Sequence, residues 1–181
     1  VDVAVRGVIV VAHTLGIEPG HGHGCPDALA RGEALPFREN RFDAIICTQV
    51  VQYFDDPFQA VKEMHRTLKK NGVVFLSGPG TYPLFDPPNP KWRFMPDGFR
   101  RLFTGFSRVE VRPLGGFLLC YFQILNLFLK QLVFGKPWEN GLTKRVMWWL
   151  VFPLLNILGK ALDALFPNYK ASIGYLVIAR K

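Results

Sequence analysis

Cysteine is scarce in this 181-residue sequence, and the three cysteines, Cys25, Cys47 and Cys120, lie far apart. Their number is odd, and none has a histidine at metal-ligand spacing. His21 and His23 share a glycine-rich segment, but no third ligand accompanies them. These absences exclude a disulfide framework, predict no metal site and favour a reducing, cytoplasmic setting.

Charged residues are also few, at 20% of the chain, whereas hydrophobic residues reach 49% and the mean hydropathy is +0.14. Such a composition predicts additional buried apolar surface. The net charge of +8 and a pI near 9.6 suit an anionic partner: nucleic acid, a phospholipid surface or a phosphorylated substrate. No run of basic and aromatic residues and no zinc-finger or RNP-like motif occurs, which argues against nucleic acid.

The first residues lack the features of a secretory signal. They read VDVAVRGVIVVAH, without an initiating methionine, a basic first segment or a small-residue cleavage site. We therefore expect no signal peptide and interpret the chain as beginning within a longer protein.

The central part of the sequence predicts a parallel β-sheet. Apolar runs at 8–17, 43–50 and 72–78 lack clean alternation, which is typical of strands buried on both faces. Between the last two runs, apolar residues recur at helical spacing from Asp56-Pro57, an N-terminal signal, to Asn71-Gly72, a C-cap signal. Strand, helix and strand within so few residues form a βαβ unit.

Further elements are expected in the second half of the chain. After a proline-rich loop, Asp97 caps a short predicted helix, and strands are expected at 106–114 and 171–181. Two hydrophobic helices, 117–134 and 143–166, lie between these strands. We therefore predict a partial α/β core at 1–116, a helical insertion at 117–166 and a closing strand at 167–181.

Residues 34–80 resemble the central block of class I S-adenosylmethionine-dependent methyltransferases, in particular the small-molecule, quinone and glycan types. WRFMPDGFRRLF, FSRVEV and YLVIARK resemble later elements of the same family. The central resemblance depends on four ordered motifs: Leu35-Pro36-Phe37, Phe42-Asp43, Asp56-Pro57 and Leu68-Lys69-Lys70-Asn71-Gly72.

The resemblance implies a Rossmann-like α/β fold, with a parallel sheet and an antiparallel last strand, that binds S-adenosylmethionine at the carboxyl ends of its strands. Glu18 would accept the ribose hydroxyls, or else be a solvated turn residue. The methionine part of the cofactor would lie near the end of the family's fourth strand, which corresponds to the apolar run at 43–50. The alternative is that the residues there only pack at the strand end. The remaining implied cofactor contacts are Glu33, Ala34 and Leu35 at the adenine, and Cys47, Thr48 and Gln49 at the strand end.

Acceptor contacts would follow the fourth and fifth strands of the family. Tyr53, Tyr82, Asp86 and Trp92 are the candidates, and Tyr53 is also the one weak candidate for proton transfer. Each could equally be a pocket or loop residue. Methyl transfer from a sulfonium depends mainly on positioning and desolvation, so it demands no catalytic dyad.

Three departures from the family pattern stand out. No glycine-rich loop follows a first strand, so we expect the fold to be incomplete at its N-terminus. Arg31 stands where the family has an acid, with Glu33 as a substitute. Tyr53 stands where many members have histidine.

The two hydrophobic helices do not predict transmembrane spans. The first contains Gln123, Asn126 and Lys130, and the second is interrupted by Pro153. Tryptophan and basic residues border both, which favours interfacial helices at an anionic membrane, although they could also cover the sheet.

The sequence thus predicts an enzyme that transfers methyl groups to a lipid-linked, quinone-like or glycan acceptor. We expect it in the cytoplasm, peripherally on the inner face of the cytoplasmic membrane. The alternatives are a truncated or degenerate methyltransferase-fold binding or scaffold domain without catalysis, and a membrane-anchored interaction module.

Overall fold

The structure is a computed structural model, and it describes residues 2–5, 8–11, 30–83, 90–133 and 141–181. The chain divides into two compact units. The first comprises Val1–Pro79, Leu84–Arg112 and Tyr175–Lys181, and the second comprises Gly80–Pro83 and Pro113–Gly174.

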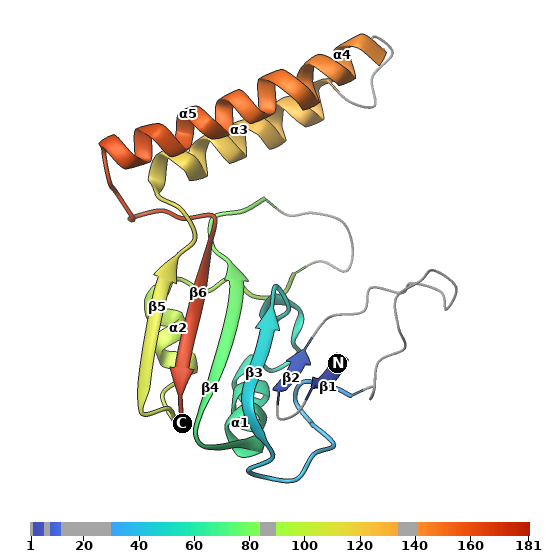
Figure 1. Cartoon of the computed structure of the whole chain (residues 1–181), viewed down its shortest axis with the longest axis vertical. Coiled ribbons are helices and arrows are strands. Elements are labelled where there is room, and N and C mark those ends of the chain that lie inside the picture. Colours follow the sequence, from blue (N-terminus) through green and yellow to red (C-terminus); the bar gives the residue numbers. More distant parts are fainter. Residues whose placement is uncertain (1, 6–7, 12–29, 84–89, 134–140) are drawn as a thin grey trace. The chain divides into compact units, whose positions relative to one another are not determined.

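A six-stranded sheet in the order β1-β2-β3-β4-β6-β5 forms the centre of the first unit (Figure 1). β2 pairs with β3, and β3 with β4, in parallel, whereas β6 runs opposite to β4 and β5 (Figure 1). This confirms the predicted α/β class with an antiparallel last strand. The strands are β1 Asp2–Val5, β2 Val8–Val11, β3 Phe42–Thr48, β4 Leu68–Pro79, β5 Arg108–Pro113 and β6 Gly174–Arg180.

Two helices cover one face of this sheet, α1 (Pro57–Thr67) and α2 (Pro96–Leu102) (Figure 1). The Asp56 side chain caps α1 by accepting hydrogen bonds from the backbone N–H groups of Phe58 and Gln59, at 2.9 and 3.0 Å. The core under the helices is apolar and fully enclosed. Its most deeply buried side chains are Ile45, Met64, Leu68, Val74, Leu76, Phe99, Phe103, Tyr175 and Val177.

Two predicted helix boundaries are wrong. α1 ends at Thr67, not at Asn71-Gly72, because Leu68 turns into extended backbone and is fully buried as the first residue of β4. Asp97 is not the cap of α2. It lies in the first turn, where its carboxylate accepts a hydrogen bond from Arg100 at 2.6 Å.

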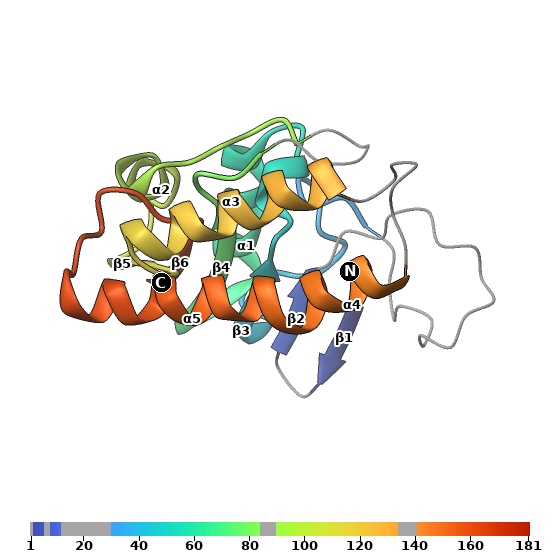
Figure 2. The same cartoon turned by 90° about the horizontal axis from the view of Figure 1, so that it is seen from above.

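A helical hairpin forms most of the second unit. α3 (Phe117–Val133) packs beside α5 (Phe152–Leu165), and the two run in opposite directions in both views (Figures 1 and 2). α4 (Gly141–Val146) and a π-helical turn (Met147–Val151) precede α5 without a break. The widened turn accommodates Pro153, which has no N–H to donate.

Pro153 does not interrupt this helix, contrary to the expectation from sequence. Gly141–Leu165 is a single 25-residue helix with a mean hydropathy of 1.3 in its most apolar window, only 11% of which is buried. Its length and composition alone would permit a membrane span, which is weak evidence by itself.

Candidate cofactor site

The carboxyl ends of β2, β3 and β4 meet at one edge of the sheet, because these strands are parallel. At this edge the side chains of Thr48 and Gln49 are exposed. Gln49 has a left-handed backbone with a φ of 55°, which is uncommon for a residue other than glycine. Its N–H donates to the backbone oxygen of Ser77 at 3.0 Å and to the Ser77 hydroxyl at 3.2 Å. The Gln49 Nε2 also donates to the Ser77 hydroxyl at 3.4 Å. The strand end is thereby held in one conformation, and the Thr48 side chain and the Gln49 side-chain oxygen are left for a ligand.

Cys47 precedes this edge, but its side chain belongs to the core. The thiol is fully buried, and burial raises its pKa to about 12. It is therefore neutral and enclosed by apolar neighbours. Only the backbone of Cys47 is left for the predicted contact with a cofactor.

The predicted adenine segment is fixed by contacts distant in sequence. The Glu33 carboxylate accepts hydrogen bonds from the N–H groups of Asp55 and Asp56, at 2.8 and 3.3 Å. Leu35 is buried, and its N–H donates to Glu63 at 3.1 Å. Glu33 therefore stabilises the turn before α1, and only Ala34 presents an exposed side chain.

An ion cluster that the sequence did not predict lies beside this segment. Asp55 accepts hydrogen bonds from both Lys91 and Arg31. Lys91 first, and Arg31 with it, hold the pKa of the Asp55 carboxyl below its ordinary value. Arg31, which replaces the acid of the family pattern, thus has a structural partner in this chain.

Gln52 is the other residue that the sequence analysis missed. Its side chain is 1% exposed, and its Nε2 donates to the backbone oxygen of Gln49 at 2.8 Å. Among the residues that the structure describes, its buried Oε1 has no hydrogen-bond partner. Buried polar atoms in folded proteins rarely lack a hydrogen-bond partner. The available signal was one polar residue within the apolar segment VVQYF.

The predicted acceptor residues that the structure describes belong to both compact units. Tyr53 is half-buried just after the β3 edge, with its N–H donating to the Val50 oxygen at 2.9 Å. The Trp92 indole N–H donates to the Phe54 oxygen at 2.9 Å, so its polar atom is already used within the fold. Tyr82 belongs to the second unit. Glu18 and Asp86 lie outside the described residues.

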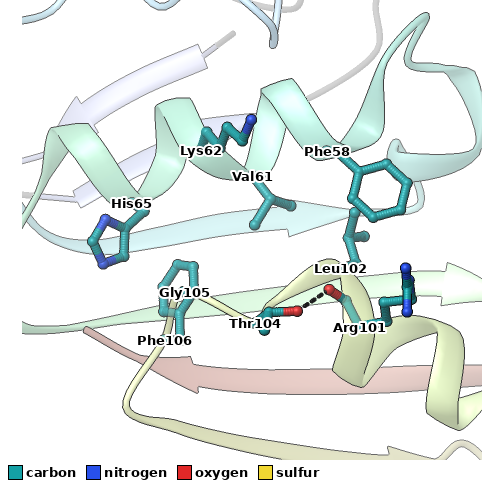
Figure 3. Close-up of a pocket in the computed structure, with 9 residues that line it drawn as sticks. All are labelled: Phe58, Val61, Lys62, His65, Arg101, Leu102, Thr104, Gly105 and Phe106. Atoms are coloured by element: carbon teal, nitrogen blue, oxygen red, sulfur yellow. Dashed lines mark hydrogen bonds between the residues drawn. The ribbon is translucent and has the colours of Figure 1, made fainter.

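A separate pocket of about 540 Å³ lies between α1 and the turn after α2 (Figure 3). Phe58, Val61 and Phe106 give it apolar walls, and Lys62 and Arg101 lie at its rim (Figure 3). None of the predicted site residues lines this pocket.

The residues at the β3 edge fit one wall of an S-adenosylmethionine site. Thr48 and Gln49 offer exposed polar groups, and the unpaired Oε1 of Gln52 could accept a hydrogen bond from a bound ligand. The predicted ribose contact, Glu18, falls outside the described residues.

Comparison with known proteins matches residues 13–76 to a family model described as a methyltransferase domain. Over 44 residues the chain is 43% identical to a tRNA U34 carboxymethyltransferase of Campylobacter curvus, covering 24% of this chain and 15% of that protein. Over 54 residues it is 41% identical to the biotin biosynthesis bifunctional protein BioHC of Teredinibacter turnerae, covering 30% of this chain and 10% of that protein. The chain thus spans less than a fifth of the length of these relatives.

Among solved structures, the [4+2]-cyclase SpnF is similar with a TM-score of 0.50 and 13% identity, covering 85% of this chain and 56% of that one. A methyltransferase of Archaeoglobus fulgidus, described as SAM-dependent, gives 0.45 and 15%, covering 80% of this chain and 62% of that one. The likeness to SpnF shows the fold alone.

Proposed function

Because this chain belongs to the class I S-adenosylmethionine-dependent methyltransferase family, we propose that it transfers a methyl group from S-adenosylmethionine to a lipid-linked, quinone-like or glycan acceptor. The family match over residues 13–76 confirms the family predicted from sequence, and with it S-adenosylmethionine as the cofactor of that family. One observation carries the proposal for this chain: the exposed, conformationally fixed end of β3 at Thr48 and Gln49.

Within this proposal each described residue has a limited task. Thr48 and Gln49 would bind the methionine part, Ala34 would lie against the adenine, and Gln52 would offer its unpaired oxygen. When bound, S-adenosylmethionine supplies a methyl group on an activated sulfonium, so the protein has to orient the reactants and exclude water. Tyr53, half-buried beside the same edge, is the candidate acceptor contact.

The helical hairpin would bring the enzyme to its acceptor. Trp148 and Trp149 are exposed on it, and Lys144, Arg145 and Lys160 are exposed as well. Aromatic and basic residues beside an apolar surface suit the interface of an anionic membrane. We therefore include peripheral docking on the inner face of the cytoplasmic membrane in the proposal.

Two observations favour the alternative, a binding or scaffold domain without catalysis. The Cys47 thiol is enclosed in the core, and the Glu33 carboxylate is occupied by the turn before α1. Two predicted cofactor residues are therefore unable to offer their side chains.

Calorimetry with S-adenosylmethionine, followed by transfer of a labelled methyl group to a total lipid extract, separates these functions. Loss of the Thr48 hydroxyl in Thr48→Val should weaken binding roughly three- to tenfold, as for one hydrogen bond. Thr104→Val, an exposed threonine after α2, is the matched control. Label in the lipid fraction supports the enzyme, whereas binding without transfer, or no binding at all, supports the domain without catalysis and overturns the proposed methyl transfer.

A further inference from the structure

A groove of about 360 Å³, with polar and apolar residues in its lining, lies along the hairpin of the second unit. Gln123, Asn126 and Lys130 line it from one face of α3, at the spacing of successive helical turns. Asn156 and Phe152 contribute from α5, and Trp148 from the π-helical turn. The volume is within the range of small-ligand pockets. Polar side chains gathered on otherwise apolar helices require an explanation.

The paired asparagines leave one acceptor atom unsatisfied. Asn126 donates its Nδ2 hydrogen to the Oδ1 of Asn156 at 2.9 Å. The Oδ1 of Asn126 is itself buried, and no described residue donates to it. The Gln123 amide also makes no hydrogen bond within the described part of the chain. These amides match a ligand that carries hydroxyl groups, because a hydroxyl both donates and accepts.

The same groove carries a cation and an aromatic wall. The Lys130 ammonium is exposed, and no carboxylate of the described residues lies within ion-pair distance of it. The rings of Trp148 and Phe152 meet edge to face, with centroids 5.6 Å apart. An indole of this kind offers an apolar surface to the ring of a ligand.

We propose that this groove binds the headgroup of the acceptor lipid, and that the headgroup is a hydroxylated ring or polyol joined to a phosphodiester. Asn126 and Gln123 hydrogen-bond its hydroxyls, Lys130 pairs with its phosphate, and Trp148 packs on its ring. The proposal rests on the proposed function and narrows it, since a quinone has neither the phosphate nor the hydroxyls that this groove satisfies.

The segment that carries Tyr82 supports the assignment of the groove to the acceptor headgroup. Tyr82, which the sequence suggested as an acceptor contact, lines this groove and follows Pro79, the last residue of β4, by three residues. Backbone hydrogen bonds of 2.9 Å from Gly80 to Ile173 and from Thr81 to Ser172 hold the connecting segment within the second unit. The segment that carries Tyr82 is therefore fixed as part of the groove of the second unit.

Two soluble headgroups of equal net charge test the proposal on the full chain. Glycerophosphoinositol carries a hydroxylated ring, and glycerophosphoserine does not. In calorimetric titrations we expect a preference of roughly tenfold for the inositol compound, corresponding to one or two hydrogen bonds. Asn126→Leu and, independently, Gln123→Leu should each reduce this preference. Lys130→Gln should weaken the binding of both ligands alike, and Lys170→Gln, at an exposed lysine outside the groove, should change the binding of neither.

Vesicles identify the source of the headgroup. Phosphatidylcholine vesicles containing phosphatidylinositol should retain more protein than vesicles with equal phosphatidylserine, and Asn126→Leu should remove the difference. Equal affinity for the two soluble headgroups, or a preference that survives both amide variants, overturns the proposal. Selection of soluble headgroups without selection between vesicles overturns the lipid assignment. Failed methyl transfer with intact headgroup selection would count against the proposed activity alone.

Discussion

The two units of this chain treat apolar side chains in opposite ways. Under α1 and α2, Ile45 and Met64 are completely buried, because the apolar faces of the sheet and of the helices pack against each other. On the hairpin, Trp149 is 83% exposed, Leu142 71% and Ile157 66%. Soluble proteins rarely expose contiguous apolar surface of this kind unless something else covers it.

This difference explains the composition of the sequence. The first unit has an ordinary buried core. The excess hydrophobic residues lie on the two helices of the hairpin, which pack against each other through small or polar residues. At Gly159 an added Cβ would lie 3.0 Å from the Phe122 ring, so the helices approach closely there. Their large side chains point outward instead. The exposed apolar face of the hairpin is therefore the surface on which the proposed membrane docking depends.

The strongest test of this contrast introduces charge on the exposed face of α5. Leu154→Glu combined with Ile157→Glu should abolish sedimentation with anionic vesicles. Each substitution removes about 1.5 to 3 kcal/mol of the free energy gained by transferring the apolar side chain into the membrane. The affinity for vesicles should therefore fall by more than roughly a hundredfold.

Phe58→Glu is the matched control, because Phe58 is an exposed hydrophobic residue on α1 of the other unit. It should leave sedimentation unchanged. If the double variant still sediments like the unaltered protein, the hairpin is not the membrane contact and the contrast loses its functional meaning.

A core substitution tests the other half of the contrast. Met64→Ala removes a side chain that is fully enclosed between α1 and the sheet, and should lower the free energy of unfolding by about 2 to 5 kcal/mol. Leu154→Ala, on the exposed face, should change it by less than about 0.5 kcal/mol. Urea unfolding of both variants measures the difference. Equal losses would show that Leu154 is packed in solution.

Much of the fold could be predicted because its signals are local. The apolar runs, the Asp56-Pro57 start of α1 and the helical spacing after it all occur within a few residues of one another, and the structure places strands and a helix there. The end of α1 was wrong because a long-range effect decides it: burying Leu68 against the sheet outweighs the Asn71-Gly72 signal.

The candidate cofactor site at the carboxyl end of β3 was less predictable for the same reason. A continuous apolar strand does not show which face its residues occupy, so the burial of Cys47 could not be anticipated. Glu33 is bound by Asp55, 22 residues away, and Lys91 pairs with Asp55 across 36 residues. Such partners are defined only once the loops have folded.

The junction of the hairpin gives a smaller effect. The Asp163 carboxylate at the end of α5 accepts hydrogen bonds from the N–H groups of Gly116, Leu118 and Leu119, between 2.8 and 3.2 Å. It therefore caps the start of α3 from a second helix. Asp163→Ala should cost about 1 to 2 kcal/mol locally.

Hydrogen exchange at the Leu118 and Leu119 amides measures this loss, which should appear as roughly tenfold faster exchange. Asp97→Ala is the control, since among the described residues that exposed carboxylate forms an ion pair only with Arg100, and its side chain does not cap α2. Unchanged exchange in Asp163→Ala would mean that the hairpin is held by the packing between α3 and α5 alone.

The smallest expected effect is a pH dependence confined to the α/β unit. Hydrogen bonding from Arg66, supported by the Leu35 N–H, holds the pKa of Glu63 below its ordinary value of 4.5, although burial opposes this. The folded protein thus binds fewer protons here than the unfolded chain. The stabilisation that Glu63 gives the folded state is complete above pH 4.5 and is lost as the pH falls through the lowered pKa.

Glu63→Gln should lower the free energy of unfolding by less than about 1 kcal/mol at pH 7 and leave it unchanged at the acid end. Urea midpoints from pH 7 downward should therefore converge for the two proteins, whereas Glu110→Gln, in a more exposed pair with Arg112, should differ less from the unaltered protein. Parallel curves for Glu63→Gln would mean that the cost comes from altered packing, and that the Arg66 pair contributes nothing to holding residue 35 at the cofactor edge.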